Sequence, residues 1–145
     1  MEVKRIQPEQ AYDLRLRVLW PHKEKRENCV VDIDNSEDAI HLGTFDGERI
    51  VAIGSLFRSD TPKIAHTEKY RLRAMATDPE YRGQHAGEML VRKAIEILRS
   101  KSIDVLWCDA RLNAIGFYEK IGFKVIDEVY EVPIIGPHKF MYYEL

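Results

Sequence analysis

"KYRLRAMATDPEYRGQHAGEMLVRKAIEILR", residues 69–99, decides the fold of this 145-residue chain. In the run 69–77 the apolar residues Tyr70, Leu72 and Ala74 alternate with Arg71 and Arg73, which is the period of a strand with one buried face. Asp78-Pro79 ends this strand. From 84 to 99 apolar residues recur at helical spacing, so the stretch predicts a strand, a turn with two glycines and an amphipathic helix. The predicted buried stripe of that helix consists of Ala86, Leu90, Ala94, Ile97 and Leu98.

The run after this helix, "DVLWC" at 104–108, is short and apolar and predicts a buried strand. Residues 68–108 therefore form a βαβ unit, which requires a parallel strand pair and a right-handed crossover. Cys108 ends the run, and we expect it to be a buried free thiol.

The N-terminal half predicts a strand, a helix and a hairpin. "MEVKRI" alternates as a strand, and Pro8 suits the first turn of a helix that Pro21 stops. The runs 39–45 and 49–57 predict antiparallel strands joined by the three-residue turn "DGE". Residues 22–38 are polar and irregular, and predict a mobile surface excursion.

After the βαβ unit the pattern predicts a helix at about 111–121, ended by Gly122, and two closing strands at 123–132 and 139–145. The loop "PIIGPH" joins these strands. We predict an α/β fold of the α+β kind, with a mixed, mostly antiparallel central sheet that contains the βαβ unit and has helices on both faces. The length fits a single domain, residues 1–145.

Composition narrows the function. The chain is 45% apolar and 32% charged with a formal net charge of −2, so it lacks the basic field that drives nucleic-acid binding. Two cysteines without a CxxC pair predict neither a disulfide framework nor a zinc site. No apolar run approaches a membrane span, and "MEVKRIQPEQ" lacks the apolar core expected of a signal peptide. We expect a cytoplasmic protein that binds no nucleic acid, membrane or metal.

The turn at residues 82–87, "RGQHAG", opens a helix directly after a strand. The first N–H groups of a helix have no partner within it, and the helix dipole adds positive charge, so such a turn can bind an anion. The stretch lacks the Gly-Lys-Ser/Thr of a P-loop and the Gly-x-Gly of a dinucleotide fingerprint. Glycines needed only for the geometry of the turn are the alternative interpretation.

In this context "ATDPEYRGQHAGEMLVRKAIE" resembles the acetyl-CoA-binding motif of the GNAT superfamily of N-acetyltransferases, Gln/Arg-x-x-Gly-x-Gly/Ala. Arg82 matches its first position and Gly87 its last, while His85 stands where the family usually has the middle glycine. "NAIGFYEKIGF", residues 113–123, is similar to the family's second signature. The likeness covers roughly residues 68–124, with both motifs in the family's order and spacing.

The resemblance implies that acetyl-CoA is the co-substrate. Its pyrophosphate would meet backbone N–H groups of the turn, and its pantetheine arm would meet the end of the preceding strand, where an N–H would also stabilise the oxyanion. The implied cofactor-binding residues are Met75, Ala76, Thr77, Arg82, Gly83, Gln84, His85, Ala86, Gly87 and Asn113. Arg111 replaces an asparagine often found seven residues before the family's tyrosine, and Asn113 supplies an amide nearby or serves only as a cap.

Tyr118 is the residue to which the resemblance assigns the catalytic acid, since a phenol stays protonated at neutral pH. The alternative is that Tyr118 only packs its helix against the sheet. The sequence pattern does not identify a single residue as the general base. Glu68 at the start of the strand and His138 in the loop are candidates, as is a water that relays the proton to a carboxylate. Arginines that could receive an acidic acceptor, or be salt-bridged, are Arg71, Arg73 and Arg111.

The leading hypothesis is an N-acetyltransferase that passes the acetyl group directly to an amine of a small molecule or peptide. A non-catalytic acyl-CoA-binding or sensing module is the second reading, and a plain protein-interaction domain the third. A homodimer is a default expectation, because the closing strand is rich in Tyr and Phe and dimers are common.

Overall fold

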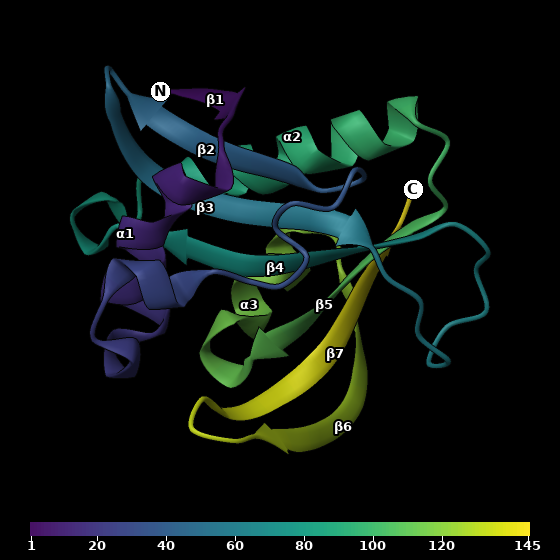
Figure 1. The fold of residues 1–145 in the computed structure, drawn as a ribbon. Helices are drawn as coiled ribbons and strands as arrows, with labels where there is room; N and C mark the ends of the chain where they lie inside the picture. Colours follow the sequence, from purple (N-terminus) through teal and green to yellow (C-terminus); the bar gives the residue numbers. More distant parts are fainter. The chain divides into compact units, whose positions relative to one another are not determined.

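The computed structural model describes residues 1–126 and 128–145, and of residue 127 the backbone alone. Its strands are β1 (Glu2–Arg5), β2 (Ile40–Asp46), β3 (Arg49–Arg58), β4 (Lys69–Thr77), β5 (Val105–Arg111), β6 (Lys124–Val132) and β7 (Gly136–Glu144) (Figure 1). Residues 8–19 form a helical stretch made of a 3₁₀ turn (Pro8–Ala11), α1 (Tyr12–Leu14) and a π-helical turn (Arg15–Leu19). The longer helices are α2 (Ala86–Ser100) and α3 (Ile115–Ile121). The predicted order of strands and helices is confirmed.

Residue contacts group the chain into two compact units. Unit 1 consists of Met1–Phe57 and Leu72–Ala94, and unit 2 of Arg58–Arg71 and Ile95–Leu145. Strand β4 and helix α2 each run from one unit into the other, since the boundaries fall inside them.

In unit 1 the strand order is β1-β2-β3-β4, with β1–β2 and β2–β3 antiparallel. Successive residues of β3 point to opposite faces of the sheet. Ile53 packs in a buried cluster with Ala11 and Leu14 of the helical stretch, whereas a Cβ at Gly54 would lie 2.9 Å from Leu90 Cδ2 of α2. Helices therefore cover both faces of these strands, as predicted (Figure 1).

Arg15 ties residues 22–38 to the sheet of unit 1. Its fully buried guanidinium donates to both carboxylate oxygens of Asp34, at 2.7 and 3.0 Å, to Cys29 O at 2.9 Å and to Ser55 Oγ at 3.1 Å. His41 lies between Ser55 Oγ, at 2.7 Å, and the Asp34 carbonyl, at 2.8 Å. The segment is irregular, as predicted, but it is pinned to buried groups rather than lying loose on the surface.

The β2–β3 hairpin differs from its prediction in one detail. Asp46 pairs with Arg49, so the turn contains two residues, Gly47 and Glu48, instead of three. Gly47 takes φ +60°, which glycine adopts without steric cost. An irregularity between Thr44 and Phe45 shifts the register and absorbs the extra residue.

In unit 2 the start of β4 pairs parallel with β5, from Lys69↔Val105 to Arg71↔Trp107, which confirms the βαβ unit. β5–β7 and β6–β7 are antiparallel, so the sheet is mixed and mostly antiparallel. Helix α3 packs on one face of the sheet through contacts between aromatic rings. The ring centroid of Phe123 lies 5.1 Å from that of Tyr118 and 5.5 Å from that of Tyr143. Cys108 is a buried free thiol, as predicted.

Helix α2 and strand β7 begin at other residues than predicted, and strand β5 continues past the predicted Cys108 to Arg111. Helix α2 begins at Ala86 rather than at 84, and its buried stripe includes Val91 and Ile95, while Ile97 is only half-buried. Strand β7 begins at Gly136, so His138 lies in a strand paired with Tyr130 and not in a loop.

Candidate active site

The 82–87 turn leads into α2 and presents an exposed surface in unit 1. Arg82, Gly83, Gln84 and His85 are all exposed, and a Cβ at Gly83 would meet no atom within 4 Å. Gly83 has φ +80°, so its glycine identity is needed for the backbone conformation rather than for space. The turn is therefore accessible to a ligand from solvent.

Backbone donors at this turn are available. The first amide that closes a helical hydrogen bond is that of Met89, which donates to His85 O at 2.9 Å. Among the described residues no acceptor meets the N–H groups of His85, Ala86 and Gly87. Three unpaired donors at a helix N-terminus suit an anionic phosphate group, so this part of the chain fits coenzyme A.

His85 occupies the left-handed region, with φ +66°. The expected middle glycine of the motif is thus replaced by a residue that adopts a conformation glycine takes more easily. Its imidazole is exposed, and Nδ1 lies 3.5 Å from Glu88 Oε1. The side chain contacts its own helix and leaves the backbone N–H available.

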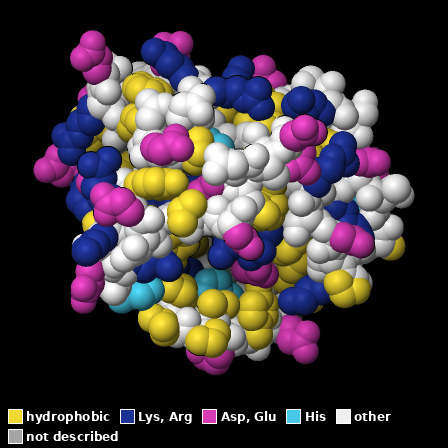
Figure 2. Space-filling model, viewed as in Figure 1, with side chains coloured by type: hydrophobic (Ala, Val, Ile, Leu, Met, Phe, Trp, Pro, Cys, Tyr) yellow, Lys and Arg dark blue, Asp and Glu magenta, His cyan; other side chains and the backbone are white. Residues whose placement is uncertain are grey.

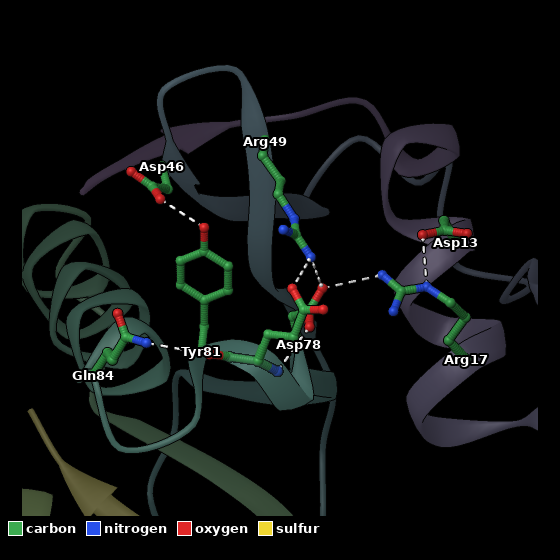
Figure 3. Close-up of polar contacts among 8 residues, drawn as sticks. Asp13, Arg17, Asp46, Arg49, Asp78, Tyr81 and Gln84 are labelled. Carbon is green, nitrogen blue, oxygen red and sulfur yellow. Dashed lines mark hydrogen bonds and ion pairs between the residues drawn. The ribbon is translucent and has the colours of Figure 1, made fainter.

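Asp78 connects the turn to two other elements of unit 1 (Figure 3). Its buried carboxylate accepts hydrogen bonds from Glu80 N at 3.0 Å, Arg49 Nη2 at 2.9 Å and Arg17 Nη2 at 3.3 Å. The Glu80 hydrogen bond, helped by Arg49 and Arg17 and opposed by burial, lowers the pKa of Asp78. Tyr81 Oη donates to Asp46 Oδ2 at 2.6 Å, which ties the same 3₁₀ turn (Pro79–Tyr81) to the hairpin.

The end of β4 places Met75, Ala76 and Thr77 directly before this turn. Ala74, one residue earlier, has φ +55°, an uncommon conformation for alanine within a strand. Among the described pairs, the β4–β5 ladder does not continue beyond Arg71 and Trp107. Strained backbone of this kind concentrates at functional sites, and the strand end is a candidate for binding through backbone N–H groups.

Tyr118 lies in unit 2 on α3 and is 5% exposed. Its ring contacts Phe117 and Phe123, at centroid distances of 5.0 and 5.1 Å. Burial, with a smaller contribution from Cys108, raises the pKa of Tyr118 well above its usual value. The ring therefore packs the helix, as in the alternative reading, and the role of the phenol as catalytic acid stays a prediction.

Asn113 and Arg111 lie at the start of the same helical segment. Asn113 is exposed in the 3₁₀ turn Leu112–Ala114, and Arg111 precedes that turn in an extended conformation. Burial lowers the pKa of Arg111. Asn113 is therefore accessible to a ligand, and its role as a cofactor contact stays a prediction.

Asp109 was missed by sequence reasoning, because we ended the strand at Cys108. It lies on β5, where its carboxylate accepts from Arg71 Nη2 at 2.7 Å and from the hydroxyl of Tyr130. Asp109 and Trp107 are two residues apart and thus lie on one face of the strand. Figure 2 shows hydrophobic side chains gathered over the β6–β7 hairpin with charged side chains beside them.

Several of the candidate bases and arginines form ion pairs or hydrogen bonds with other residues. Glu68 forms an ion pair with Arg58, and Arg71 with Asp109. His138 is buried, and its Nδ1 lies 2.8 Å from Gly136 O, the geometry of a strand-end packing residue. Within the described residues no group of three or more His, Cys, Asp or Glu side chains could hold a metal ion, and no described helix could cross a bilayer.

Comparisons with known proteins agree with this arrangement. A model of the acetyltransferase (GNAT) family matches residues 5–123. An uncharacterised N-acetyltransferase of Bacillus subtilis, YitI, is 37% identical over 142 residues, which are 98% of this chain and 95% of that protein. A peptidyl-lysine N-acetyltransferase of Salmonella typhimurium, YjaB, is 40% identical over 52 residues, covering 36% of this chain and 34% of that protein.

Solved structures share the fold. Escherichia coli ElaA superposes with a TM-score of 0.78 at 21% identity, over 97% of both chains. An aminoglycoside 6'-N-acetyltransferase complexed with coenzyme A superposes with a TM-score of 0.76 at 16% identity, over 99% of this chain and 97% of the other. These likenesses, at such low identity, concern the fold alone.

Proposed function

Because the chain belongs to the GNAT family of acetyltransferases and is an acetyl-CoA-dependent N-acetyltransferase, we propose that it passes the acetyl group directly to the amine of a small molecule or a peptide. The observation that carries this proposal is the N-terminus of α2, which follows the exposed residues 82–85 and where no acceptor among the described residues meets the N–H groups of His85, Ala86 and Gly87. These donors would bind the pyrophosphate, and Arg82, Gly83 and Gln84 would border it.

The end of β4 would bind the pantetheine arm. Met75, Ala76 and Thr77 follow the strained Ala74, and one of their N–H groups would stabilise the oxyanion that forms when the amine attacks the thioester carbonyl. Asn113 would contribute a hydrogen bond to the cofactor from its exposed turn.

Tyr118 would complete the transfer. The amine nitrogen forms a bond to the carbonyl carbon, the carbon–sulfur bond breaks, and the Tyr118 phenol gives its proton to the departing thiolate. The raised pKa of Tyr118 keeps that proton available at neutral pH. The amine loses its proton to water, since Glu68 and Asp109 are already paired with arginines.

The relatives act on different acceptors, which share an amine. The matched Salmonella protein is a peptidyl-lysine acetyltransferase, and one structural neighbour is an aminoglycoside acetyltransferase. A homodimer and a cytoplasmic location remain predictions.

The test is to incubate the protein with acetyl-CoA and a panel of aminoglycosides, polyamines and lysine peptides while following free thiol. Thiol release above the rate without amine is expected for at least one class. Binding of coenzyme A without thiol release across the whole panel would favour the non-catalytic acyl-CoA module instead.

A further inference from the structure

Lys63 extends from the loop 59–68 and places its ammonium over two aromatic rings of unit 2. Nζ lies 4.3 Å from the centroid of Tyr130 and 5.0 Å from that of Phe140. We propose that this face, defined by Tyr130, Phe140 and Asp109, receives the primary ammonium of an alkylamine acceptor, and that Lys63 occupies the acceptor's place. That the bound amine is an acetyl acceptor rests on the proposed function. That this face binds an ammonium group rests on the two contacts of Lys63.

The aromatic face is built by the strand pairing. Phe140 on β7 pairs with Asp109 on β5, and its ring stacks on Trp107 at 5.3 Å. Tyr130 on β6 pairs with His138, whose ring lies 6.2 Å away and nearly parallel. The rings of Phe140 and Tyr130 are thus positioned by contacts with Trp107 and His138. A cation within about 6 Å of a ring centroid is attracted by the negative face of the ring.

The position of Lys63 is fixed by its loop. Trp107 Nε1 donates to Ser59 O at 2.9 Å, and Lys69 Nζ donates to Asp60 Oδ1 at 2.6 Å and to Thr61 O at 2.8 Å. Thr61 Oγ1 in turn accepts from Lys63 N at 3.3 Å. The backbone up to Lys63 is therefore anchored, while its side chain is exposed and free to be displaced.

The two rings, rather than the Asp109 carboxylate, attract the cation, because that carboxylate is already paired. The hydroxyl of Tyr130 donates to Asp109, and the second oxygen of Asp109 accepts from Arg71. Arg71 is committed further, since its guanidinium lies 4.9 Å from the Trp107 ring centroid. In the contacts of the described residues, the Lys63 ammonium lies over the two rings and pairs neither with Asp109 nor with the groups that anchor the loop. An incoming ammonium can replace it without leaving a buried charge unpaired.

The first experiment is independent of catalysis. In protein labelled with ¹³Cε-lysine, the Lys63 Hε signal, assigned by its loss in Lys63→Met, is expected to be shifted upfield by the two rings. Adding Nα-acetyl-lysine methylamide should move this signal toward its solvent value. The norleucine analogue, which has the same chain without the charge, should not move it.

The second experiment uses acetyl transfer to the same lysine amide. Lys63→Met should lower KM by about 2–5-fold, the size of one exposed cation–π contact, with kcat little changed. Tyr130→Leu should raise KM, whereas Tyr130→Phe, which keeps the ring, should retain most of the affinity. Lys101→Met is the matched control, because Lys101 lies exposed after α2, and it should change nothing. Aniline, neutral at pH 7, should show no effect of Lys63→Met.

Different results would contradict the ammonium site and the proposed acetyl transfer. Acetyl transfer to the lysine amide without displacement of Lys63, or with unchanged KM in both Lys63→Met and Tyr130→Leu, overturns the ammonium site and leaves the proposed function standing. Displacement of Lys63 by the lysine amide without thiol release from acetyl-CoA supports the ammonium site and counts against transfer to this acceptor. An equal response to the norleucine analogue also overturns the inference, since the site would then be merely apolar.

Discussion

Tyr118 carries a hydroxyl that makes no hydrogen bond to any described residue, so Tyr118→Phe removes a proton donor and little else. We expect kcat to fall by roughly 10²–10⁴-fold, the usual contribution of general acid catalysis, with unchanged acetyl-CoA affinity. The free energy of unfolding should hardly change. Because the pKa of Tyr118 is raised, ionisation of the phenol should not limit the wild-type rate below about pH 10.

Tyr118→Leu is the control for packing. It loses the ring contacts to Phe117 and Phe123 and should destabilise the protein by about 1–3 kcal/mol, from two aromatic pairs. An unchanged kcat in Tyr118→Phe, with chemistry shown to limit the rate, would remove the residue from the mechanism.

His85→Gly should stabilise the protein by about 0.5–1 kcal/mol. A left-handed conformation costs an ordinary residue about 1–2 kcal/mol, and glycine gives back part of this gain through its greater freedom when unfolded. Chemical denaturation measures the change. His85→Ala keeps the strained backbone without the imidazole and should show no gain.

Both His85 variants should retain their affinity for coenzyme A, because the proposed contact is the backbone N–H. A loss of tenfold or more, about 1.4 kcal/mol, in both variants would instead mean that the imidazole binds the phosphates.

At the scale of elements, Asp78 joins the helical stretch, the start of β3 and the turn before α2, and it should make stability depend on pH. Its pKa is lowered in the folded protein from about 3.9 in the unfolded chain. The stabilisation is therefore fully present above the unfolded pKa and is lost as the pH falls through the lower, folded value. Asp78→Asn should be less stable at pH 7 and lose less stability between pH 5 and pH 2.

Asp13→Asn is the matched control for this prediction, since Asp13 binds Arg17 at 2.9 Å on the surface and exposed pairs contribute little. Thermal melting of all three proteins across this pH range provides the comparison. Identical pH slopes for wild type and Asp78→Asn would contradict the assignment.

Strands and helices were predicted correctly where the spacing of apolar residues is regular. They were missed where the backbone conformation depends on contacts with other segments. The alternation from Tyr70 to Ala76 gave β4 correctly, because one face of that strand is buried throughout. Pro137 suggested a loop, but it pairs with Glu131 near the hairpin end, where a strand tolerates a residue without an N–H. Nothing in the identity of Ala74 foretells its positive φ, because that conformation is imposed by the surrounding structure.

At the scale of the whole molecule, coenzyme A should raise the melting temperature. A ligand at a hundredfold excess over its dissociation constant stabilises the native state by about 2.7 kcal/mol. Gly87→Glu should abolish this shift, since the added carboxylate repels the pyrophosphate. Gly87→Gln, equal in size but neutral, should retain part of it. Gly87 is buried, so both variants should also fold less readily.

The overall architecture was readable from the sequence because the βαβ unit and both family motifs lie in continuous segments of the chain. The contacts of Lys63 with Tyr130 and Phe140 were not, since they depend on the register shift between Ile126 and Val129 in the last hairpin. The sequence lists these residues, but the register of the β6–β7 strand pair determines which side chains are in contact.

The buried attachment of Asp34 and the Cys29 carbonyl to Arg15 has a consequence for protein engineering. Between Trp20 and Cys29 the chain forms two short 3₁₀ turns, whose side chains are exposed or half-buried up to Asn28. Loop-closure entropy grows only slowly with loop length, by about 0.6 kcal/mol per doubling. Libraries that vary the length and sequence of residues 21–28 while keeping Arg15, Asp34 and Ser55 should therefore remain folded, which makes this segment a natural insertion site for new binding surfaces.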